Sequence, residues 1–128
     1  MISISDERFS TFVSESIDSL PEKFGREIKN VAFVVEDEPN LDQRAKLQLT
    51  KHQSLFGLYE GIPLTHRGTN YTFVLPDKIT IFKQVIAQHS QSEEQVAALV
   101  KRTVWHEVAH HFGLDHGRIE ELERRDTA

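Results

Sequence analysis

The sequence of 128 residues predicts an α+β fold, in which a small mixed β-sheet of three to four strands packs on an N-terminal helix and a long helix. Three observations predict it: a helical repeat of apolar residues near the start, short β-branched and aromatic runs between residues 31 and 82, and a capped helical segment from residue 92. A short helix is expected at the C-terminal end. The length suits one hydrophobic core, so we expect residues 1–128 to form a single domain.

The N-terminal helix is expected over residues 6–19. Its apolar residues recur at helical spacing: Phe9, Phe12, Val13, Ile17 and Leu20. Asp6 and Glu7 fall in the first turn, where negative charge suits the helix dipole. Pro21 ends or redirects the segment, and residues 21–28 are expected to form a turn or a short helix.

Residues 31–35 are expected to form a central strand, because the run is short, apolar and β-branched. The acidic run at residues 36–38 could attract a metal ion, but we interpret it as a solvated strand end before a loop. Residues 40–54 are polar with scattered leucines, which indicates a loop or a loose helix.

Further strands are expected at residues 55–61, 71–74 and 78–82. The first is flanked by glycines, and residues 75–77 separate the other two as a turn. The stretch 64–70 is rich in turn-forming residues. Together with residues 31–35, these segments account for the three to four strands of the sheet.

The long helix is expected to begin after Ser92 and to run from residue 93 to 112, a length of about 30 Å. Ser92 and Gln95 have the spacing of a capping box. Apolar residues are expected on both sides of the helix: Val96, Leu99, Val100 and Thr103 on one, and Trp105, Val108 and Phe112 on the other. A helix that is apolar on both sides belongs inside the domain.

The end of this helix carries the pattern H-E-x-x-H-x-x-G-x-x-H over residues 106–116. His106 and His110 are four residues apart, so both imidazoles leave the same face of a helix and can bind one zinc ion. Glu107 lies about 100° around the helix, which places its carboxylate beside the metal, where it can hold a water. Gly113 can adopt the left-handed conformation that ends a helix, and the chain can then bring His116 in as a third ligand.

Three protein ligands and one water make the open coordination of a catalytic zinc site. Zinc lowers the pKa of such a water toward about 7, and Glu107 would accept its proton, orient the attack on a carbonyl carbon and pass the proton to the leaving amine. Three imidazoles would also suit nickel, cobalt or copper. His111 is about 100° from His110 and is not expected to bind the same ion. The simpler alternative is a polar helix end with solvated histidines.

This run resembles the zinc signature of the metzincin clan of metallopeptidases. The wider chain resembles a family of small bacterial zincin-like proteins, often called minimal zinc metallopeptidases, through residues 20–21, 34–39, 55–64, 75–82 and the histidine motif. The resemblance implies a zincin-like fold, with a sheet above the zinc helix whose edge strand can pair with an extended peptide. It also implies one zinc ion held by His106, His110 and His116, with Glu107 as the catalytic base.

The sequence departs from the metzincin pattern after the third histidine. Metzincins place a methionine turn beneath the zinc, whereas the only methionine here is Met1 and twelve residues follow His116. We therefore expect no metzincin lower domain. A second donor for the tetrahedral oxyanion is also not fixed by spacing; the candidates are Tyr59, Tyr71, His66 and Arg67.

Three functions fit the motif. The first is a zinc-dependent peptidase acting on a peptide or protein. The second is a metal-dependent endoribonuclease, because the three-histidine run is also similar to that of a small bacterial ribosomal-RNA endoribonuclease family, although that family usually has glycine where Glu107 stands. The third is a non-catalytic zinc-binding regulatory protein. Glu107 favours the peptidase over the other two.

Composition limits the partners. The net charge of −5 gives no electrostatic footprint for nucleic acid, so no nucleic-acid partner is expected. The chain has no cysteine, which leaves His, Asp and Glu as metal ligands and fits a reducing compartment. The first nine residues include Asp6, Glu7 and Arg8, with no apolar signal core, and no stretch has membrane-spanning length. We expect a cytoplasmic protein with no membrane partner.

Overall fold

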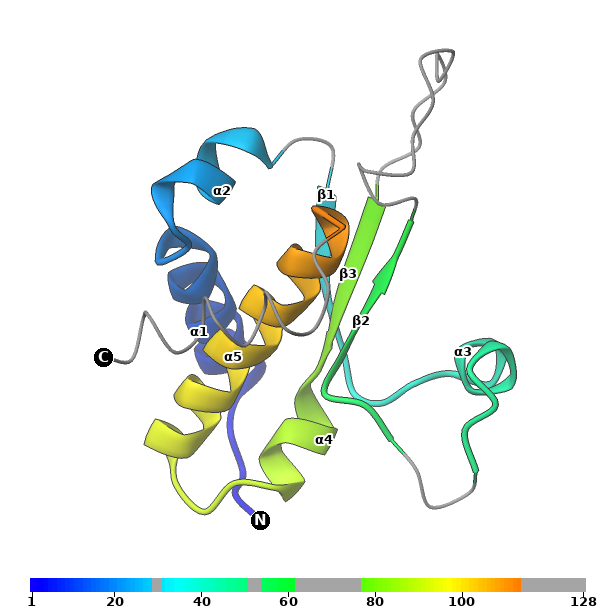
Figure 1. Ribbon diagram of the computed structural model, residues 1–128. Coiled ribbons are helices and arrows are strands. Elements are labelled where there is room, and N and C mark those ends of the chain that lie inside the picture. The colour runs from blue at the N-terminus through cyan, green and yellow to red at the C-terminus, as the bar shows by residue number, and fades with distance from the viewer. Residues whose placement is uncertain (29–30, 51–53, 62–76, 114–128) are drawn as a thin grey trace.

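The structure is a computed structural model that describes residues 1–28, 31–50, 54–61 and 77–113 (Figure 1). Within these residues it contains five helices and one three-stranded mixed sheet, which confirms the predicted α+β class. In Figure 1, α1 and α5 lie side by side and cover one face of the sheet, whereas α3 lies beyond β2, away from this helix pair. None of the described helices is both long and apolar enough to cross a membrane.

The sheet has the strand order β1-β3-β2, with β1 at Val31–Glu36, β2 at Gly57–Glu60 and β3 at Asp77–Phe82. β1 runs parallel to β3, and β2 runs antiparallel to it. The prediction that residues 31–35 form the central strand is wrong, because β3 takes the middle position among the described strands. Lys78 and Thr80 make β3 look less apolar than β1, yet every residue of β3 except Lys78 is buried.

Helix α1 spans Asp6–Asp18, as the apolar repeat predicts. Ser5 caps it, because its hydroxyl accepts a hydrogen bond from the backbone N–H of Arg8 at 3.1 Å. Phe9, Phe12 and Val13 are buried, and the helix packs on α5. This apolar face of α1 forms one side of the core, and α5 packs against it.

Helix α5 spans Glu93–His111 and begins at the predicted cap. The Ser92 hydroxyl accepts from the N–H of Gln95 at 3.2 Å, but the side chain of Gln95 accepts from the N–H of Gln91 instead of Ser92. Only half of the predicted capping box therefore forms. The helix ends at His111, with Phe112 as its C-cap, and Gly113 follows in the expected left-handed conformation, with φ of 75°.

Three shorter helices complete the description. α2 spans Glu22–Glu27 and follows Pro21, and α3 spans Leu41–Lys46 within the stretch expected to be a loop or a loose helix. A reciprocal capping box between Asn40 and Gln43 starts α3. α4, at Lys83–Gln88, continues directly from β3 and was not predicted, because no glycine or proline separates the two elements.

Some predicted features lie outside the described residues. They are the strand at residues 71–74, the turn-rich stretch 64–70, the short C-terminal helix and the third histidine of the motif.

Candidate functional site

Helix α5 presents three neighbouring rows of side chains, each with members four residues apart. One row is apolar and fully buried (Val96, Val100, Val104 and Val108), the next is buried but partly polar (Thr103, Glu107 and His111), and the third is partly exposed (His106 and His110). The second row faces the sheet through contacts with β2 and β3. The helix therefore places its histidine pair beside a buried carboxylate.

His106 and His110 come together as the four-residue spacing predicts. Their ring centroids lie 4.8 Å apart, with the ring planes at 76°. One donor atom from each of His106, Glu107 and His110 lies within 4.8 Å of the others. The structure thus gathers two imidazoles and one carboxylate at a single point.

Glu107 reaches from α5 to β2, which is an edge strand among the strands that the structure describes. Its side chain is only 8% exposed, and Oε1 accepts a hydrogen bond of 2.9 Å from the backbone N–H of Tyr59. Burial raises the pKa of Glu107 from 4.5 to about 7, although the bond from Tyr59 opposes this shift by stabilising the charged form. A carboxyl group with a pKa near neutrality can both accept and return a proton at physiological pH.

Gly57 allows β2 to lie close to the second row of α5. A Cβ at this position would lie 2.5 Å from Cγ2 of Thr103 and 3.3 Å from Cγ of Glu107. The first distance is far below van der Waals contact, and a β-branched side chain on a helix has little freedom to move away. The missing side chain of Gly57 therefore fixes the spacing that lets Tyr59 reach Glu107.

We expect Gly57→Ala to destabilise the protein by about 1–3 kcal/mol, as over-packing in a tight contact does. The free energy of unfolding, measured by urea denaturation, checks this. Adding Thr103→Ser removes the nearest methyl group and should restore part of the loss.

Gly25→Ala is the matched control for that experiment. A Cβ at Gly25 meets nothing within 4 Å, and the residue lies inside helix α2. Alanine there should stabilise the protein by about 0.5–1 kcal/mol through helix propensity. A Gly57→Ala protein as stable as wild type would contradict the close-packed contact.

A buried network lies behind the site. The hydroxyl of Tyr59 donates to Oδ2 of Asp77 at 2.7 Å, and Nδ1 of His111 lies 2.7 Å from the same oxygen. Asp77 was expected in a turn but is the first residue of β3. The signal that could have identified Asp77 in the sequence is a single acidic residue at the start of an apolar strand.

The predicted site residues divide by position. His106, Glu107 and His110 meet, whereas His116 lies outside the described residues. His111 is directed to Asp77, in agreement with the prediction that it does not share the ion. The hydroxyl of Tyr59 donates a hydrogen bond to Asp77, so in this arrangement it does not donate to an oxyanion. The other oxyanion candidates also lie outside the described residues: Tyr71, His66 and Arg67.

A pocket of about 290 Å³ opens beside the histidine pair, between the start of β2 and α5. It is lined by Leu55, Phe56, Gly57, Leu99, Arg102, Thr103, His106 and Glu107. The lining is half apolar or glycine and half polar or charged, and it includes Glu107 and one of the two imidazoles. The pocket therefore offers space next to the candidate site residues.

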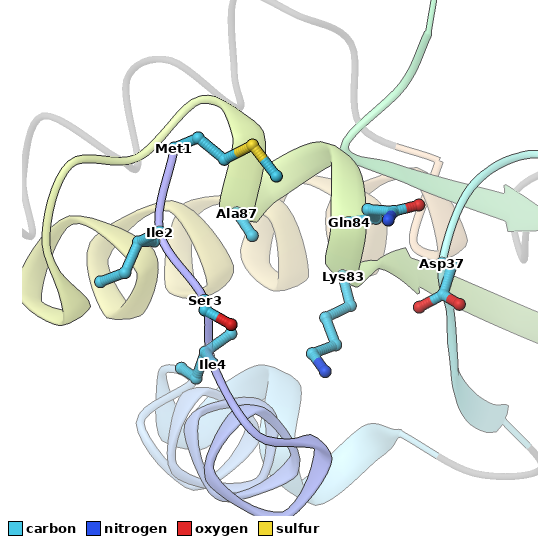
Figure 2. Close-up of a pocket in the computed structure, with 8 residues that line it drawn as sticks. All are labelled: Met1, Ile2, Ser3, Ile4, Asp37, Lys83, Gln84 and Ala87. Atoms are coloured by element: carbon cyan, nitrogen blue, oxygen red, sulfur yellow. The ribbon is translucent and has the colours of Figure 1, made fainter.

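A second pocket, of about 440 Å³, lies where the N-terminal arm meets α4 (Figure 2). Lys83 points into it, and its Nζ lies 2.6 Å from Oδ1 of Asp6. The residues that line this pocket include no histidine and none of the cluster formed by His106, Glu107 and His110. Of the two pockets, only the first is lined by residues of this cluster, namely His106 and Glu107.

The donor atoms of His106, Glu107 and His110 suit zinc. Imidazole nitrogens and carboxylate oxygens bind zinc at about 2.0–2.2 Å, so donors gathered within 4.8 Å need only small side-chain rotations to share one ion. The hydrogen bond from the backbone N–H of Tyr59 orients the carboxylate of Glu107 within this donor set.

Comparison with known proteins agrees with this geometry. A search of the curated proteins gave no match. The family model described as zincin-like metallopeptidase matches residues 28–126, which includes all three strands, α5 and the complete histidine motif. The chain therefore belongs to the zincin-like metallopeptidase family.

Proposed function

We propose that the protein is a zinc-dependent peptidase. His106 and His110, together with His116, hold one zinc ion, and Glu107 is the general base. When bound, zinc supplies a water of lowered pKa and polarises the substrate carbonyl. Family membership and the gathered donor atoms of His106, Glu107 and His110 support the proposal.

Glu107 performs the proton transfers. The backbone N–H of Tyr59 fixes Oε1, so the carboxylate keeps one orientation while its other oxygen accepts the proton of the attacking water. The same residue then returns the proton to the amine that leaves. In the metal-free protein, burial raises the pKa of Glu107 toward neutrality, which favours protonation of this carboxylate when it takes the proton of the water.

The position of Glu107 at the sheet edge favours a peptide as the substrate. β2 pairs with β3 on one side, and the Tyr59 N–H that Glu107 binds points away from β3. An extended chain that lay along this edge would pass directly beside the carboxylate. This is the observation that carries the proposal. The net charge of −5 also favours a peptide or protein over a nucleic acid.

The test is cleavage of a diverse unstructured peptide library by the zinc-loaded protein beside a Glu107→Gln variant of equal zinc content. We expect only the wild type to cleave, with kcat in the variant lower by about 10²–10⁴. Glu94→Gln makes the same chemical change at an exposed position in the first turn of α5 and should cleave like wild type.

Single-stranded RNA is assayed with the same three proteins. Metal-dependent RNA cleavage without peptide cleavage would replace the proposal with a nuclease. Zinc binding without cleavage of either substrate would contradict a general peptidase and favour the non-catalytic zinc protein.

A further inference from the structure

A buried carboxylate on the central strand has no part in the chemistry described so far. Asp77 is 3% exposed and is the first residue of β3. Burying an ionised carboxylate costs several kcal/mol unless hydrogen bonds compensate. An apolar residue at this position would pack without that energetic cost. The hydrogen-bond partners of Asp77 therefore indicate what the carboxylate does.

Two ring side chains meet this carboxylate, one from each neighbouring element. The hydroxyl of Tyr59 on β2 and Nδ1 of His111 on α5 each lie 2.7 Å from the same oxygen, Oδ2. With Asp77 as a carboxylate, Nδ1 of His111 is the donor. The two rings also contact each other edge to face, with centroids 5.8 Å apart. The carboxylate therefore joins three elements at one point.

Close backbone packing maintains this junction. A Cβ on Gly61 would lie 2.5 Å from both Cγ and Oδ1 of Asp77. Only glycine lets the chain after β2 pass so near the carboxylate. The junction is thus held on one side by backbone and on the other by two short hydrogen bonds.

Each partner of Asp77 is one step from a residue of the candidate site. Tyr59 donates its backbone N–H to Glu107, and His111 is bonded through its own backbone to His110. A shift of Tyr59 would move the donor that orients Glu107. A shift of His111 would move the last turn of α5, and with it one of the two imidazoles.

We propose that Asp77 is a positioning residue, which through Tyr59 and His111 sets the edge strand and the end of α5 and so aligns Glu107 and His110. The proposal rests on the proposed function. Its physical basis is that charge-assisted hydrogen bonds are short and directional, and that displacing a catalytic group by about 1 Å can lower the rate about a hundredfold.

Asp77→Asn is the first test, because it keeps the volume and removes the charge. We expect zinc affinity, measured by competition with a chelating dye, to fall about tenfold or more, and kcat to fall by a similar factor with KM changed less than about threefold. The visible absorption spectrum of the cobalt-substituted protein should also change in band position or intensity. These readouts do not depend on stability, provided that the variant is folded at the assay temperature.

Tyr59→Phe tests the hydrogen bond from Tyr59 to Asp77 separately from the one that His111 makes. It removes the hydroxyl but leaves Asp77 bonded to His111, so zinc affinity should stay within about threefold of wild type. We expect kcat to fall several-fold and the cobalt spectrum to change, because Glu107 loses its fixed neighbour. Combined with Asp77→Asn, the effects on kcat should be less than multiplicative, since both changes weaken or remove the same hydrogen bond between Tyr59 and residue 77. If Asp77→Asn does not fold, this variant alone decides.

Ser90→Ala is the matched control, since the buried hydroxyl of Ser90 bonds the carbonyl of Ile86 in the α4 region at 2.8 Å. Its loss should lower the melting temperature without changing zinc affinity, the cobalt spectrum or kcat. The same purely thermal effect in folded Asp77→Asn and Tyr59→Phe would overturn the proposal. If the wild type cleaves no peptide, the zinc and cobalt measurements still decide the role of Asp77, and only the proposed function fails.

Discussion

Glu107→Gln is expected to stabilise the metal-free protein at pH 8 by on the order of 3 kcal/mol, while it removes the proposed activity. The folded protein holds Glu107 in a buried position that raises its pKa from 4.5 to about 7. Each unit of such a shift corresponds to about 1.4 kcal/mol between the two protonation states. Glutamine keeps an oxygen that can accept from Tyr59 and carries no charge, so the variant avoids this cost.

The pH dependence follows from the direction of the shift. Between pH 4.5 and 7 the folded state keeps a proton on Glu107 that the unfolded chain has released. The contribution of this residue to stability is therefore fully present below pH 4.5 and is lost as the pH rises through 7. The advantage of Glu107→Gln should grow over that interval and be small below it.

Urea denaturation at several pH values, in the presence of a chelator, measures this difference. His106 and His110 lie beside Glu107 in both proteins, so their contribution largely cancels in the difference. Glu94→Gln, at the exposed start of the same helix, should show no such pH-dependent gain. A constant difference between Glu107→Gln and wild type from pH 4 to pH 8 would contradict the assigned burial effect.

Local signals explain why α1, α5 and the histidine motif could be predicted from the sequence. The four-residue spacing of His106 and His110 is set by helix geometry alone, and Ser92 and Gly113 act on backbone atoms within a few residues. Each of these features depends only on residues that are close together in the sequence. Their positions therefore agree with the structure to within one or two residues.

Contacts between distant segments explain what could not be predicted. The strand order depends on which strand the helices cover, and the polar Lys78 and Thr80 concealed that β3 is the middle one. The bond between Glu107 and Tyr59 joins residues 48 positions apart, and the bond between His111 and Asp77 joins residues 34 positions apart. Such pairs leave no periodic pattern in the sequence. The sequence therefore predicted Glu107 but not the hydrogen bond from Tyr59 that orients its carboxylate.

The apolar row and the partly polar row of α5 have different roles in the candidate site. The apolar row of α5 stabilises the helix, whereas the polar row holds a carboxylate where its charge is unfavourable. Only the folded chain holds His106 and His110 one helical turn apart, so an ion that needs both imidazoles would bind the folded state alone. Metal binding and folding should therefore be strongly coupled in this protein.

Zinc is expected to raise the free energy of unfolding by about 4 kcal/mol when its free concentration is a thousand times its dissociation constant. For a chain of this length the increase corresponds to about 15 °C in melting temperature. His106→Ala and His110→Ala each remove one of the two imidazoles that α5 brings together, and should lose most of this increase. Differential scanning calorimetry with buffered zinc and with chelator measures the effect.

His89→Gln is the control for a histidine outside the cluster, because its Nδ1 lies 2.8 Å from the carbonyl of Val85 and its ring contacts Phe56. It should keep the full response to zinc. Glu107→Gln should also keep most of it, since Glu107 is assigned to the water and not to the ion. A loss of the zinc response in Glu107→Gln as large as in His110→Ala would instead make Glu107 a third ligand, because its carboxylate lies within the same 4.8 Å cluster. The melting temperatures of these four variants therefore distinguish a base held beside the metal from a ligand bound to it.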